Sequence, residues 1–108
     1  MLKEWQERLG LTDWVIKLSS DVHNMPEGDC CGHTDWNETV KAAHIFLLHP
    51  DEYGDRVVEY DQEKTLVHEL LHIKFTFLHN MEHEDLQGRI LHQLIDDLAR
   101  ILVDAKRK

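Results

Sequence analysis

Residues 61–105 of this 108-residue chain carry apolar side chains at helical spacing, with one polar interruption at residues 79–83. Because positions three and four residues apart share one face of a helix, the pattern predicts two helices, one ending near Leu78 and one running from about Glu84 to Ala105. Asp61 is placed to cap the first helix. The short connection predicts that the two helices pack antiparallel. Their predicted apolar positions are Leu66, Val67, Leu70, Leu71, Ile73 and Phe77 in the first helix and Leu86, Ile90, Leu91, Leu94, Ile95, Leu98 and Leu102 in the second.

The N-terminal half predicts a short helix and a small sheet. Helical spacing covers residues 2–9, and Gly10 supplies a helix stop. Alternating or continuous apolar runs predict strands at residues 14–19, 33–36 and 40–48, the last two joined by a turn at residues 37–39. We therefore expect an α+β fold in which an N-terminal helix and a three-stranded, mainly antiparallel sheet pack against the two C-terminal helices. The chain is short enough to form a single domain, residues 1–108.

Composition excludes several classes of partner. The chain has 12 Lys and Arg against 21 Asp and Glu, which gives a net charge of -9. Because nucleic acids and anionic membranes bind basic surfaces, neither is expected as a partner. No apolar run is long enough to span a bilayer, and the first residues do not form the apolar stretch of a signal peptide. These features predict a cytoplasmic protein.

The sequence His68-Glu69-Leu70-Leu71-His72 fits the pattern His-Glu-x-x-His on the first predicted helix. Two histidines four residues apart lie one turn from each other on one face, so both imidazoles can reach the same zinc ion. The carboxylate of Glu69 lies beside them and can take a proton from water. The alternative is an amphipathic helix that carries two partly exposed histidines. The apolar surroundings favour a metal site, since buried polar side chains need partners.

A catalytic zinc site usually has three protein ligands and an open position for water. The candidates for the third ligand are Glu82, His83, Glu84 and His92. If the two helices are antiparallel, the rise of about 1.5 Å per residue places His92 between the levels of the first two ligands, and places Glu84 about 9 Å or more away along the axis. Geometry therefore favours His92. Asp96, one turn later, is positioned to accept a hydrogen bond from the outer ring nitrogen of a liganding histidine.

With these residues the chain resembles the minimal gluzincin metallopeptidases, or minigluzincins, and related small phage-type proteins. The resemblance extends over nearly the whole chain and implies a zincin-like fold. In that family the last helix supplies a Glu as third zinc ligand about twenty residues after the second His, and His92 stands at the matching position. Thermolysin-like gluzincins also have an Asp four residues after that ligand, and Asp96 matches this position. The chain departs from the family in having His where Glu is usual, which leaves zinc binding possible because zinc accepts three imidazoles.

The resemblance implies a zinc metallopeptidase in which Glu69 is the general base and acid. It also implies that a peptide substrate docks by β-augmentation along the strand Ala42 to Leu48. The oxyanion of the tetrahedral intermediate has four candidate stabilisers, among which the sequence does not choose: Tyr53, Tyr60, His79 and His83.

Several alternatives stay open. The domain could bind zinc without catalysis, as a regulatory or interaction module. It could also be a latent enzyme whose cleft is covered by a terminus, such as residues 103–108. Finally, Cys30 and Cys31 are expected to be ordinary loop residues, but their thiolates could bind a structural zinc or occupy the catalytic one. A substrate-contacting role for His44 or His49, which flank the predicted docking strand, is likewise open.

Overall fold

The computed structural model describes residues 1–20, 32–48, 61–75 and 86–108, with side chains in the last segment from residue 89 onward. Three helices and three strands follow one another in this part of the chain: α1 (Leu2–Arg8), β1 (Val15–Ser19), β2 (Gly32–Asn37), β3 (Ala42–Leu47), α3 (Gln62–Lys74) and α4 (Leu86–Lys106). The fold is α+β, as the sequence predicts. No helix in these segments combines the length and the apolar character that a membrane span requires.

The ends of the helices follow local signals in the sequence. Gly10 follows α1 with φ of +70°, a left-handed conformation that glycine adopts without steric cost. The side chain of Asp61 accepts a hydrogen bond from the backbone N–H of Lys64 at 3.2 Å, which confirms it as the N-cap of α3. Helix α3 ends at Lys74, four residues before the predicted end at Leu78, and residues 76–85 lie outside the described part of the chain.

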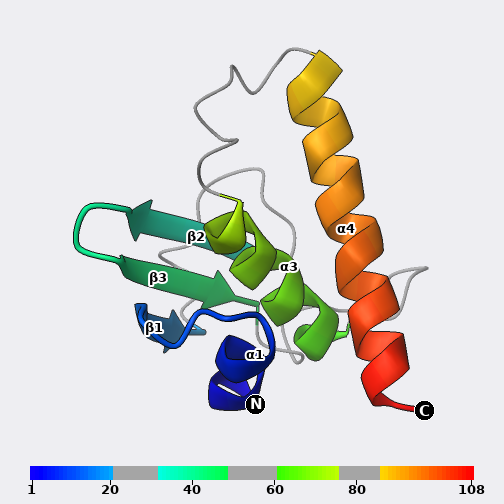
Figure 1. The fold of residues 1–108 in the computed structure, drawn as a ribbon, viewed down its shortest axis with the longest axis horizontal. Helices are drawn as coiled ribbons and strands as arrows, with labels where there is room; N and C mark the ends of the chain where they lie inside the picture. The colour runs from blue at the N-terminus through cyan, green and yellow to red at the C-terminus, as the bar shows by residue number, and fades with distance from the viewer. Residues whose placement is uncertain (21–31, 49–60, 76–85) are drawn as a thin grey trace.

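The sheet has the order β1-β3-β2 and is mixed (Figure 1). Strands β2 and β3 form the predicted hairpin, with Asn37 opposite Ala42, whereas β1 pairs with β3 in parallel, with Val15 opposite Ala42. The expectation of a mainly antiparallel sheet is therefore only half right. Alternation of apolar residues identifies strands but does not decide which neighbour a strand takes. Strand β3 lies between β1 and β2 and is parallel to the first and antiparallel to the second.

Strand β3 is the centre of the sheet, and this position overturns the predicted docking of a peptide along Ala42 to Leu48. β-Augmentation requires a strand with an open edge, since the added chain bonds to unpaired backbone groups. Both sides of β3 are already paired, one with β1 and one with β2. In this sheet the two edge positions belong to β1 and β2.

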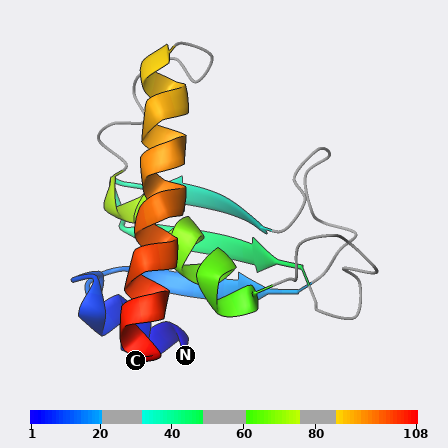
Figure 2. The same ribbon diagram turned by 90° about the vertical axis from the view of Figure 1, so that its right-hand side faces the viewer.

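Helix α3 lies between the sheet and α4, as both views show (Figure 1 and Figure 2). It packs against β2 and β3 on one side, against α4 on another, and also touches α1. The core forms around it, and the buried residues include Trp5 of α1, Ala43, Ile45 and Leu47 of β3, Leu66, Val67, Leu70, Leu71 and Ile73 of α3, and Leu91, Ile95, Ala99 and Val103 of α4.

The apolar side of α4 differs from the prediction. Leu91 and Ile95 are buried as expected, but Ile90 is 58% exposed and Leu94 is 48% exposed. In their place Ala99 and Val103 complete the buried side. The apolar residues cover a wider arc of α4 than a single neighbouring helix can bury, and α4 packs mainly against α3.

A cluster of charged residues joins the end of α4 to the beginning of α3. Arg107 donates two hydrogen bonds to the carboxylate of Asp61, at 2.6 and 3.0 Å, and these lower the pKa of Asp61. Lys106 donates to Glu63, which also accepts from the indole N–H of Trp5 at 2.8 Å. The bond from Lys106 lowers the pKa of Glu63 below its ordinary value of 4.5. This terminal ion cluster fixes the C-terminal end of α4.

The cluster predicts an acid-sensitive contribution to stability. Because the folded-state pKa of Glu63 is lowered, its contribution is present above the ordinary value of 4.5 and is lost as the pH falls through the folded-state pKa. We expect Glu63→Gln to lower the melting temperature by about 3–8 °C at neutral pH, because it removes one charged partner of Lys106. Thermal unfolding followed by circular dichroism measures the difference, which should shrink as the pH is lowered below 4.5. Glu7→Gln, at an exposed position of α1, is the control and should change little at either pH.

Candidate metal centre

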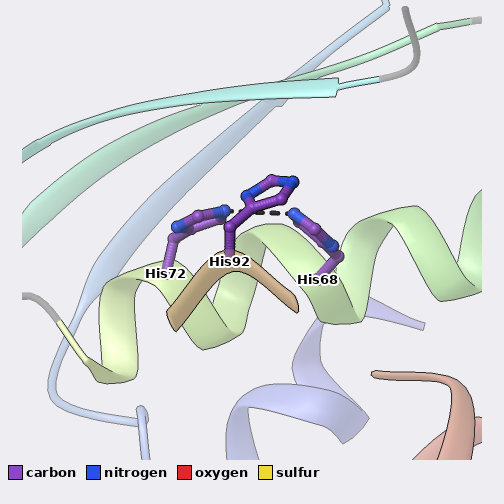
Figure 3. A group of neighbouring side chains, drawn as sticks. All are labelled: His68, His72 and His92. Carbon is purple, nitrogen blue, oxygen red and sulfur yellow. Dashed lines mark hydrogen bonds between the residues drawn. The ribbon is translucent and has the colours of Figure 1, made fainter. Parts of the chain in front are cut away.

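His68, His72 and His92 lie together between α3 and α4, and we refer to them as the three-histidine cluster (Figure 3). One ring nitrogen from each residue can be chosen so that all three lie within 4.8 Å of one another. Within the described segments no other group of three or more His, Cys, Asp or Glu side chains meets this condition. The structure therefore brings together the three residues that the sequence selects.

Two helices supply the cluster, and their antiparallel packing sets its register. His68 and His72 are one turn apart on α3, and their ring centroids are separated by 4.9 Å. The His92 ring comes from α4, with its centroid 5.0 Å from that of His68 and 5.7 Å from that of His72. His92 thus faces the turn between the first two histidines, as the rise per residue predicts. Its side chain is exposed, whereas those of His68 and His72 are half-buried.

The separation of the first two rings suits a bound zinc ion. The Nε2 atoms of His68 and His72 are 3.1 Å apart. Two imidazole nitrogens on one tetrahedral zinc ion lie about 3.3 Å apart, because each Zn–N bond is about 2.0–2.1 Å long. The chemistry of the donor set also fits, since neutral imidazoles are common ligands of zinc. The nitrogen that His92 offers lies within 4.8 Å of the other two and would complete the set.

Asp96 lies where the sequence predicts a partner for a liganding histidine. Its Oδ1 atom is 3.2 Å from Nδ1 of His68. A carboxylate accepts, so Nδ1 of His68 carries the hydrogen and donates a hydrogen bond to Asp96. In a neutral ring the lone pair is then on Nε2, the nitrogen that points toward His72. This is the tautomer that a metal ligand requires, and Asp96 fixes it.

Glu69 points toward the sheet. It is 7% exposed, and its Oε1 atom accepts a hydrogen bond of 2.8 Å from the hydroxyl of Thr34 on β2. The position follows from helix geometry, because each residue is rotated by about 100° from the one before it. His68 therefore faces α4 while Glu69 faces β2. Sequence reasoning missed Thr34, because no local pattern shows which strand a helix will pack against.

Other histidines lie away from this cluster. Residues alternate between the two faces of a strand, and Ala43 and Ile45 face the core, so His44 lies on the opposite face of the sheet. There His44 Nε2 is 2.7 Å from the hydroxyl of Ser19, and its ring centroid is 4.0 Å from that of Phe46. On the neighbouring strand, and on the same outer face, His33 pairs with Asp35 at 2.8 Å.

Several predicted residues fall outside the described part of the chain. They are the alternative ligands Glu82, His83 and Glu84, the candidate oxyanion stabilisers Tyr53, Tyr60, His79 and His83, the docking-strand neighbour His49, and the two cysteines Cys30 and Cys31. Residues 103–108, a possible cover of the cleft, lie in the described part of the chain. Val103 is fully buried in the core, and Arg107 bonds to Asp61 at the first turn of α3. That segment holds the fold together, so deleting it would remove part of the core.

No family model, curated protein or solved structure matches this chain. The interpretation of the site therefore depends on its own geometry.

The geometry predicts that the protein binds one zinc ion per chain and that His92 is required. We expect His92→Ala to weaken binding by more than about 100-fold, because it removes the ligand that α4 supplies. Zinc should also raise the melting temperature of the wild-type protein, since it binds the folded state. Competition with a chromophoric chelator measures the affinity. His33→Ala, on the outer face of the sheet, is the control, and unchanged binding in His92→Ala would contradict the assignment.

A second prediction concerns the hydrogen bond from His68 to Asp96. We expect Asp96→Asn to lower zinc affinity by about 10–100-fold, because the amide is a weaker acceptor and no longer enforces the tautomer of His68. The neighbouring Asp97→Asn provides a matched control, since Asp97 accepts from Gln93 at 3.2 Å and lies away from the cluster. Equal affinities for the two variants would show that Asp96 does not orient the ligand.

Proposed function

We propose that the chain is a zinc-dependent metallopeptidase with a zincin-like fold, which hydrolyses peptide bonds in a peptide or protein substrate. One observation carries the proposal. Three histidines from two antiparallel helices converge, and a buried glutamate directly follows the first of them on α3. A structural metal site needs only ligands, whereas a hydrolytic site also needs a base beside them.

The three-histidine cluster would hold the zinc ion through one nitrogen of each ring. When bound, zinc supplies a Lewis acid that lowers the pKa of water and polarises carbonyl oxygens. Three neutral ligands leave the positive charge of the ion unreduced, which strengthens both effects compared with a set that includes a carboxylate. His68 keeps its orientation through the hydrogen bond that its Nδ1–H donates to Asp96.

Glu69 would perform the proton transfers. As general base its carboxylate accepts a proton from the attacking water, and as general acid it delivers that proton to the nitrogen of the leaving amine. Glu69 as a residue is 7% exposed, so its side chain is largely shielded from bulk water. The strand β2 would bind the substrate, because it lies at the edge of the sheet and contacts α3, the helix that carries Glu69.

A second function needs only the three-histidine cluster and not Glu69. The cluster joins α4 to α3, so a bound ion would stabilise the packing of the two helices whether or not it is catalytic. A zinc-binding regulatory or interaction domain without peptidase activity would have the same three ligands. The two functions differ in what they require of Glu69.

Glu69→Gln distinguishes them. The amide has nearly the same shape as the carboxylate but cannot accept a proton, so we expect zinc binding to be retained and cleavage to fall by about 10²–10⁴-fold. A peptide library with mass-spectrometric detection measures cleavage by the zinc-loaded protein. Glu38→Gln, in the exposed turn between β2 and β3, is the control. If the wild-type protein binds zinc but cleaves no peptide in the library, the non-catalytic function is supported instead.

A further inference from the structure

The carboxylate of Glu69 is held by the edge strand of the sheet. Thr34 Oγ1 donates a hydrogen bond of 2.8 Å to Glu69 Oε1, across 35 positions of sequence. Both residues are buried, with 5% of Thr34 and 7% of Glu69 exposed. A hydrogen bond in such surroundings is little weakened by water, and breaking it leaves a buried carboxylate oxygen without that donor.

Gly32 makes a second contribution to the same contact. It lies two residues before Thr34 on β2 and therefore on the same face of the strand. A Cβ at position 32 would lie 3.2 Å from Glu69 Oε2, 3.3 Å from Glu69 Cγ and 2.8 Å from Thr65 Cγ2. The last distance is shorter than real Cβ contacts, so any side chain here would force Thr65 or Glu69 to move. The glycine lets the strand approach the helix closely enough for Thr34 to reach the carboxylate.

We infer that Thr34 and Gly32 are positioning residues that fix the Glu69 carboxylate for proton transfer, an inference that rests on the proposed function. A glutamate side chain has three rotatable bonds, and catalysis by a base falls steeply when the base is misplaced by about 1 Å. The threonine hydroxyl restricts this freedom and carries no positive charge. A positively charged partner in its place would make the carboxylate a weaker base.

Thr34→Val and Thr34→Ser test the inference in the zinc-loaded protein. Valine keeps the shape of threonine and removes the donor, whereas serine keeps the donor. We expect Thr34→Val to lower kcat by about 10–100-fold with KM nearly unchanged. Thr34→Ser should retain most of the wild-type kcat. Thr39→Val, in the exposed turn after β2, is the matched control. An active wild-type protein whose kcat survives Thr34→Val would overturn the inference and leave the proposed function intact.

A measurement on the zinc-free protein tests the contact independently of activity. The ¹³C resonance of the Glu69 side-chain carboxylate reports its hydrogen bonding. We expect Thr34→Val and Gly32→Ala to shift this resonance, and Thr34→Ser to leave it close to the wild-type position. An unchanged resonance in Thr34→Val would show that the hydroxyl does not hold the carboxylate and would overturn the inference. A wild-type protein that binds zinc but cleaves nothing overturns the proposed function, and this inference with it.

Discussion

The antiparallel packing of α4 against α3 places the third histidine beside the other two. Leu91, Ile95, Ala99 and Val103 form the buried side of α4 and fix its register on α3. At one end of this interface His92 meets His68 and His72, and at the other end Arg107 bonds to Asp61. The motif on α3 supplies only two ligands by itself. A shift of α4 by one residue would move His92 about 1.5 Å along the axis and rotate it by about 100°, which would take it out of reach.

Helix α3 serves three neighbours because consecutive residues on a helix point in different directions. His68 faces α4, Glu69 faces β2, and Leu70 lies in the core. The side chains proposed as ligand and base and those that pack in the core are therefore separated by rotation around one axis rather than by distance along the chain. The candidate site lies where the sheet and both helices meet, and each of the three elements supplies a part of it.

The parts of the structure that follow from local sequence were predictable. Asp61 as N-cap of α3, the hairpin of β2 and β3, and the position of His92 opposite the motif depend on residue type, alternation and the rise of a helix. The order of the strands was not predictable, because β3 pairs with both neighbours through backbone groups that every residue carries. For the same reason the sequence did not show that the expected docking strand, Ala42 to Leu48, would lie at the centre of the sheet and not at its edge. The exposure of Ile90 depends on how much of α4 its neighbour can cover. The sequence of α4 alone does not contain this information.

No local pattern predicts the contact between Thr34 and Glu69. Because of this contact, Glu69 is held more firmly than the exposed His92. Glu69 is buried and bonded to the sheet, so its position is decided by the fold before any ion binds. His92 is exposed on α4 and has rotational freedom to lose when it becomes a ligand. An ion bound by all three histidines would order the α4 side of the site, whereas Glu69 is already held by the sheet. In the proposed enzyme the position of Glu69 would not depend on the metal, because its carboxylate is held by β2.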